Sequence, residues 1–202
     1  MHHELCHIHD YNKCIEIFQI DFLGTHKIGK DMILYPLSQI CWSEYIANYL
    51  SSSSAKKCDM PKRIIDCFIL QVNESKNKIE NKIENFRVDK DIRSLLLFVK
   101  SNIEELVKSS SYVLGYTHGM NIDIEKSYPK LDALIKESYF YYTWNYLDDV
   151  LKNMRDSYPH DWEEDVIYEN LMYGFDKLYS RMGVKLSEND KYELFFELPQ
   201  RG

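Results

Sequence analysis

The segment His3-Glu4-Leu5-Cys6-His7 has residue types and a spacing that suit metal chemistry. Residues four apart on an α-helix lie on one face with their Cβ atoms about 5–6 Å apart, so both imidazoles could reach one zinc ion. Glu4 would accept a proton from a water that the metal makes acidic. The sequence therefore predicts His3 and His7 as metal ligands and Glu4 as the catalytic base.

A third ligand is predicted within the segment YPLSQICWSEYIANYLSS, residues 35–52. On a helix, Glu44 falls on an apolar face, and no Lys or Arg occurs between Asp31 and Ala55. A carboxylate directed into an apolar seam requires a cation. A zinc ion held by His3 and His7 would supply it, which makes Glu44 the predicted third ligand.

Two polar residues could support this site from the same two helices. Asp10 lies about one turn beyond His7, so it is either an alternative third ligand or a hydrogen-bonding partner for His7. Asn48 lies one turn beyond Glu44 and could orient a ligand.

A hydrolase also needs a donor for the oxygen that becomes negative in the transition state. The segment YVLGYTHGMN places Tyr116 and His118 beside Gly115 and Gly119. We expect a polar, aromatic turn between helices here, which could face the site or be an ordinary loop.

Each of these interpretations has a structural alternative. His3 and Glu4 could be polar residues on a frayed first turn, and Glu44 could lie at a helix rim or pair with a distant Arg. The aromatic residues between Tyr139 and Tyr146 are interpreted as core and half-buried surface rather than as a binding platform.

Two segments resemble the ImmA/IrrE-like metallopeptidases of bacteria and their mobile elements. They are H-E-L-C-H at residues 3–7 and E-Y-I-A-N-Y-L at residues 44–50, the latter similar to that family's E-x-x-A-N-x-(F/Y/L) helix. The resemblance covers about residues 2–55. It implies a gluzincin-like site in which His3, His7 and Glu44 bind zinc, Glu4 is the base and the substrate is a protein such as a regulator.

The chain departs from that family at its beginning. A small sheet precedes the active-site helix in the family, and its edge strand helps to hold the substrate. Because this chain starts at the motif, the resemblance predicts an N-terminally truncated member, unless the later residues replace the strand.

Composition narrows the partners and the compartment. A net charge of −7 argues against nucleic acid as the main partner, because phosphate binding needs clustered Lys and Arg. No apolar run approaches the roughly 18–20 residues of a membrane span. Five cysteines without a CxxC pair fit reduced thiols. We expect a cytoplasmic protein with a protein or peptide partner; nothing in the sequence sets the oligomeric state.

Hydrophobic periodicity predicts an all-α protein with little or no sheet. The expected helices cover residues 3–22, Pro36 to the serines at 51–54, 61–91, 92–107, 129–154 and 159–182, followed by a short helix or a strand at 192–198. On the first helix an apolar stripe is expected to face the core (Leu5, Ile8, Tyr11, Ile15, Phe18 and Phe22), and Glu4 falls on its line. Glu4 is therefore expected to point inward.

Two regions are expected. Residues 1–57 would form a zincin-like pair of metal-site helices, with a loop around Gly24–Gly29. Residues 58–202 would form a helical region of unknown role that packs on the first as one unit, after a linker at 51–59.

Two functions follow from these predictions. The first is a zinc-dependent metallopeptidase that hydrolyses peptide bonds in a protein substrate. The second is a catalytically impaired remnant of such an enzyme that acts as a helical protein-interaction module.

Overall fold

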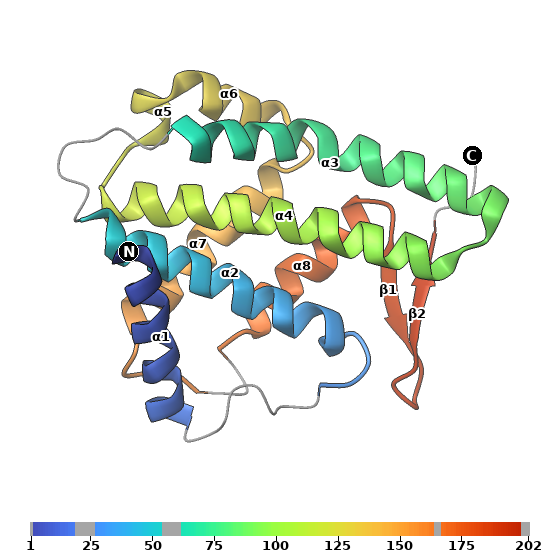
Figure 1. Cartoon of the computed structure of the whole chain (residues 1–202), viewed down its shortest axis with the longest axis horizontal. Coiled ribbons are helices and arrows are strands. Elements are labelled where there is room, and N and C mark those ends of the chain that lie inside the picture. Colours follow the sequence, from blue (N-terminus) through green and yellow to red (C-terminus); the bar gives the residue numbers. More distant parts are fainter. Residues whose placement is uncertain (1, 19–26, 54–61, 164–166, 199–202) are drawn as a thin grey trace.

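Figure 1 shows the fold in a computed structural model, which describes residues 2–18, 27–53, 62–163 and 167–198. The elements follow one another as α1 (His2–Phe18), α2 (Asp31–Ser52), α3 (Lys62–Asp89), α4 (Ile92–Gly119), α5 (Ile124–Ser127), α6 (Pro129–Glu137), α7 (Tyr141–Ser157), α8 (Glu169–Arg181), β1 (Lys185–Glu188) and β2 (Leu194–Glu197). Within these ranges the only sheet is the antiparallel hairpin of β1 and β2. The prediction of an essentially all-α fold is confirmed.

Helix α4 is the centre of the molecule and lies between α2 and α3 (Figure 1). Two glycines of α4 allow α2 to approach it closely. A Cβ on Gly115 would stand 2.3 Å from the carbonyl oxygen of Tyr45, and one on Gly119 would stand 2.5 Å from that of Tyr49. The backbones of α2 and α4 therefore touch where a side chain would hold them apart.

Replacing Gly115 by alanine should lower the free energy of unfolding by about 2 kcal/mol, because α2 would have to move away from α4. Urea denaturation measures this loss. Ser101→Ala, at an exposed position of the same helix, is the control and should be as stable as the wild type. A Gly115→Ala protein as stable as the wild type would contradict the close contact.

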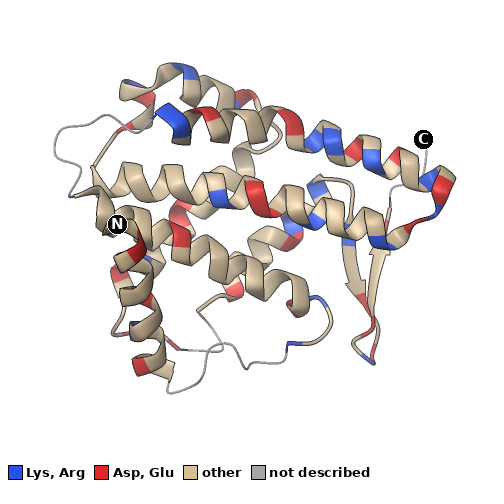
Figure 2. Cartoon of the chain, in the orientation of Figure 1, with Lys and Arg blue, Asp and Glu red and all other residues tan. Residues whose placement is uncertain are grey.

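Helices α3 and α4 form a long hairpin that turns at Lys90 and Asp91. The Asp91 side chain caps α4 by accepting a hydrogen bond from the Ser94 amide at 3.0 Å. In the second half of α3, Ile79 and Ile83 are buried on an otherwise polar helix. Figure 2 shows acidic and basic residues interspersed along α3, the pattern of a solvated face.

The buried side chains form one hydrophobic cluster that extends from Cys14 in α1 to Leu186 in β1. It draws on residues both before and after the expected boundary at residue 57. That boundary lies in residues 54–61, outside the described part of the chain, as do Phe22 and most of the predicted loop around Gly24–Gly29.

Several predicted boundaries are wrong. Helix α2 begins at Asp31, so Pro36 lies inside it. The single helix expected at 129–154 is divided into α6 and α7, and the helix expected from 159 begins at Glu169. Of the two alternatives for the C-terminal segment, the strand is correct, because Leu194–Glu197 pairs with β1.

The orientation of α1 also differs from the prediction. Its buried residues are Cys6, Asp10, Cys14 and Phe18. Of the expected core stripe, Phe18 is buried as predicted. Four other residues of the stripe are instead exposed, from 36% for Ile15 to 57% for Ile8 (Leu5, Ile8, Tyr11 and Ile15). We call these four residues the outer face of α1. Hydrophobicity alone predicted the wrong face, because the buried face of α1 carries two small cysteines and an aspartate that accepts a hydrogen bond from Trp42 of α2.

Among the described helices, none is long and apolar enough to cross a lipid bilayer.

Candidate metal centre

The first turns of α1 and the middle of α2 bring three potential metal ligands together: His3, His7 and Glu44. The Nε2 atoms of the two histidines are 3.0 Å apart. Oε2 of Glu44 lies 3.6 Å from Nε2 of His3 and 3.4 Å from Nε2 of His7. Ligand atoms around a tetrahedral ion with bonds of about 2.0–2.1 Å lie roughly 3.3 Å apart. The three side chains could therefore hold one metal ion.

The Glu44 carboxylate itself calls for a cation. Its side chain is 15% exposed, and Oε2 is buried without a hydrogen-bond partner among the described residues. Lys108 of α4 reaches only the other oxygen, with 3.9 Å between Nζ and Oε1. That ion pair is long and partly exposed, so it stabilises the carboxylate little. Pairing with a distant cation, the alternative to metal binding, therefore explains only Oε1. Oε2 still faces the two imidazoles.

The two imidazoles have different proton affinities because they are so close. Burial and the neighbouring charge of His7 lower the pKa of His3. The Glu44 carboxylate, whose Oε2 lies 3.4 Å from Nε2 of His7, raises the pKa of His7. Burial alone would raise the pKa of Glu44, but the close approach of His7 and the charges of Lys108 and His3 lower it overall. Without metal, an added proton therefore binds to His7 in preference to His3.

Ser43 fixes the orientation of His7. Its Oγ is 2.9 Å from Nδ1 of His7. When Nδ1 carries the proton and donates it to Ser43, Nε2 has a free lone pair directed toward His3 and Glu44. Ser43 precedes Glu44 in the chain, so one turn of α2 supplies both a potential ligand and the partner that orients another.

Helix α4 contributes two residues that the sequence interpretation missed, Lys108 and Tyr112. The Tyr112 ring packs edge-on against the His3 ring, with 6.4 Å between centroids. Burial, and then the negative charge of Glu44, raise the pKa of Tyr112 to about 12. Its hydroxyl therefore stays protonated at neutral pH and can donate a hydrogen bond. Only the tertiary packing of α4 on α2 reveals these residues, because nothing in their local sequence points to a site.

Glu4 is exposed, which contradicts the expectation that it points inward. Glu4 was expected to point inward because it lies in line with the outer face of α1, which was predicted to be buried. That face is exposed to solvent instead. Glu4 still contributes to the electrostatics of the site, because its charge raises the pKa values of both His3 and His7. It follows His3 directly in the chain and is exposed to solvent.

Asp10 is not part of the ligand group. It is 4% exposed, and its Oδ1 accepts a hydrogen bond from Nε1 of Trp42 at 3.1 Å. Burial raises the pKa of Asp10 to about 6, despite the hydrogen bond from Trp42. The Asp10 carboxylate therefore links α1 to α2 through Trp42, about one helical turn beyond His7.

Asn48 is buried on α2 and does not contact the Glu44 carboxylate. Its Nδ2 donates to the main-chain carbonyl of Glu44 at 2.7 Å. The side chain thus bonds along its own helix, beside Gly115 of α4.

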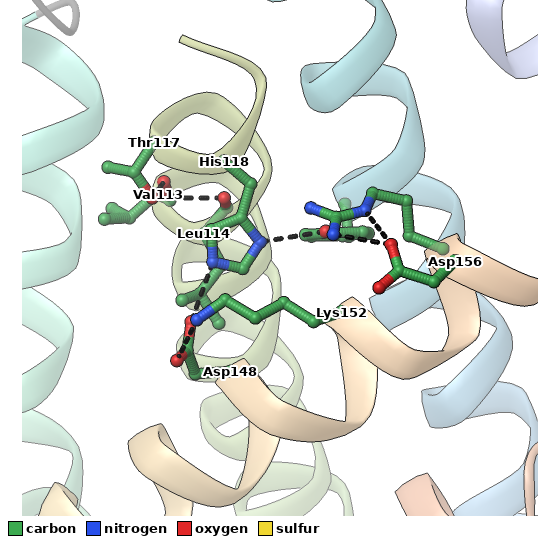
Figure 3. A network of polar contacts seen from close by, with 9 residues as sticks. Val113, Leu114, Thr117, His118, Asp148, Lys152 and Asp156 are labelled. Atoms are coloured by element: carbon green, nitrogen blue, oxygen red, sulfur yellow. Dashed lines mark hydrogen bonds and ion pairs between the residues drawn. The ribbon is translucent and has the colours of Figure 1, made fainter. Parts of the chain in front are cut away.

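The turn expected around Tyr116 and His118 does not exist, because both residues lie in the last turns of α4. Tyr116 is buried. His118 belongs to a separate network, which Figure 3 shows between α4 and α7. Its Nδ1 is 2.8 Å from the Tyr45 hydroxyl and its Nε2 is 2.7 Å from Oδ1 of Asp148. Neither residue joins the group of three potential ligands.

This second network fastens the helix that carries Glu44. Tyr45, the next residue, is fully buried and tied through His118 to Asp148, which also accepts from Lys152 at 2.6 Å (Figure 3). The rotation of α2 about its axis is thereby set, and with it the direction of the Glu44 side chain.

Comparison of the chain with models of known protein families, with curated proteins and with solved structures finds no match.

Proposed function

We propose that the chain is a zinc-dependent metallopeptidase of the ImmA/IrrE-like kind that acts in the cytoplasm on a protein or peptide substrate. One observation supports this most strongly. Two imidazole nitrogens and a carboxylate oxygen stand 3.0–3.6 Å from one another at the seam of α1 and α2. Two nitrogen donors favour zinc over magnesium or calcium, which prefer oxygen ligands.

Three protein ligands leave the fourth position of a tetrahedral zinc site open, as in catalytic sites. Bound zinc would supply Lewis acidity, which lowers the pKa of water and polarises a peptide carbonyl. Glu4, which is exposed beside His3, would take the proton from the attacking water and pass it to the leaving amine. The Tyr112 hydroxyl would donate a hydrogen bond to the carbonyl oxygen as it becomes negative.

Replacing Glu4 by glutamine should reduce peptide cleavage by at least about a hundredfold and leave zinc binding unchanged, because the amide cannot accept a proton. The assay uses zinc-loaded protein and a library of quenched fluorescent peptides. Glu16→Gln, an exposed position on the same helix, is the control and should cleave like the wild type. Equal cleavage by Glu4→Gln would refute the role of Glu4 as the base.

The outer face of α1 favours a second candidate function. Four large apolar side chains exposed along one helix are typical of a surface that another protein covers. A zinc-loaded wild type that cleaves no peptide in the library would support this alternative, a helical interaction module that keeps a metal site without turnover.

A further inference from the structure

A groove between α7 and α8 has a lining that differs in charge from the chain as a whole. It has a volume of about 310 Å³ and is lined by Tyr142, Thr143, Tyr146, Tyr173, Lys177 and Arg181, together with a glycine. The chain carries a net charge of −7, yet the lining has two cations and no carboxylate. The volume lies at the lower end of the range for small-molecule sites, about 300–1,000 Å³.

The two cations are held above tyrosine rings. Lys177 Nζ lies 5.0 Å from the centroid of the Tyr173 ring, and the Arg181 guanidinium lies 5.2 Å from that of Tyr142. The two residues are four apart on α8, so they lie on one face. Among the described residues, neither forms an ion pair with a carboxylate. Their positive charges are therefore available to an anion.

A hydrogen bond to α7 also holds the Arg181 side chain in position. Its Nη1 donates to Oγ1 of Thr143, a buried residue of α7, at 3.1 Å. This bond uses one edge of the guanidinium, and the remaining N–H groups can still bind a ligand oxygen in the forked arrangement that arginine makes with phosphates.

The walls of the groove are aromatic and well defined. Tyr142 is 68% exposed and Tyr173 is 57% exposed. Tyr146 is held in place by its hydroxyl, which donates to the carbonyl of Asn170 at 3.0 Å. Its ring lies directly against Gly174, where a Cβ would approach it to 2.7 Å. A planar ligand would thus find ring surfaces next to the two cations.

We propose that this groove binds the phosphate monoester of an aromatic group, with the phosphate between Lys177 and Arg181 and the aromatic group against Tyr142 or Tyr173. A phosphate monoester carries a charge of about −1.5 to −2 at pH 7, which matches two cations. A carboxylate would neutralise only one of them. The aromatic part gains from burying ring surface against tyrosine. The site is independent of the metal centre and of the peptidase proposal.

Isothermal titration of the full-length protein with phenyl phosphate tests the proposal. We expect saturable binding, with benzoate binding at least about fivefold more weakly because it carries one charge. Lys177→Gln combined with Arg181→Gln should weaken phenyl phosphate at least about tenfold. Lys177→Gln alone, which disturbs no hydrogen bond to Thr143, should weaken it in the same direction.

The control is Lys126→Gln combined with Lys130→Gln, two exposed lysines with the same spacing outside the groove; it should bind like the wild type. Adenosine 5′-monophosphate and phosphotyrosine, titrated in parallel, represent the two natural sources of such a group, and the tighter of the two identifies the source. Absence of saturable binding by all these phosphates, or equal weakening by both double variants, would overturn the proposal.

Discussion

Replacing Glu44 by alanine should lower the affinity of the protein for zinc by at least about a hundredfold. Structural zinc sites with four protein ligands bind with about 10–16 kcal/mol, so one ligand contributes on the order of 3 kcal/mol. Glu44 is also the only acidic ligand of the group, and its negative charge offsets part of the charge of the ion. With alanine, two neutral imidazoles would remain, and both would lose the carboxylate that lies 3.4–3.6 Å away.

The measurement is zinc content and competition with a chelator of known affinity, at pH 7.5. Glu80→Ala, on the exposed side of α3, serves as the control and should bind one zinc per chain like the wild type. Glu44→Gln separates charge from size, and we expect it to fall between the wild type and Glu44→Ala. If the wild type takes up no zinc, or if Glu44→Ala binds zinc as tightly, the assignment of this metal centre fails.

Replacing Asp10 by asparagine should stabilise the metal-free protein by about 3 kcal/mol at pH 8 and leave its stability unchanged at pH 4. Burial raises the folded-state pKa of Asp10 from 3.8 to about 6. The folded protein therefore holds this proton more tightly than the unfolded chain. Stability from Asp10 is highest when the group is protonated in both states, and it falls as pH rises from about 4 to above 6. A shift of about 2 pKa units corresponds to about 3 kcal/mol.

Asparagine is uncharged at every pH and can still accept the hydrogen bond from Trp42, so the difference between variant and wild type should grow through this window. Urea denaturation at four pH values, with a chelator present, measures it. The same variant should bind zinc with unchanged affinity, because Asp10 lies outside the ligand group. A large loss of zinc affinity would instead make Asp10 a ligand, and a pH-independent difference would contradict the raised pKa.

The grouping of the three potential ligands was predictable from the sequence to the extent that its geometry is local. The spacing of His3 and His7 determines that they share a helix face, and a carboxylate without a cation in its own helix pointed to Glu44. Lys108 and Tyr112 were not predictable, because they come from α4 and reach the site only through its contact with α2. No local property of those two residues indicates that contact.

The glycines of α4 were misinterpreted for a different reason. Gly115 and Gly119 were interpreted as signs of a turn, whereas they are sites of close helix approach inside α4. Both interpretations are physically sound for glycine, and only the partner helix distinguishes them. The same holds for α1, where hydrophobicity alone predicted the buried face. The face that is buried carries Cys6, Asp10 and Cys14, and Asp10 accepts a hydrogen bond from Trp42 there.

Because α1 packs mainly on α2, the docking of this helix would affect how a metal ion is bound. The helix packs mainly on α2, and its outer face has no partner among the described residues. Two of the three potential ligands sit at its beginning and the third sits on α2, so docking of α1 and loading of the ion form one linked equilibrium. Substitutions deep in the seam, far from any ligand, would therefore change the measured affinity by changing the fraction of molecules in which the first helix is seated.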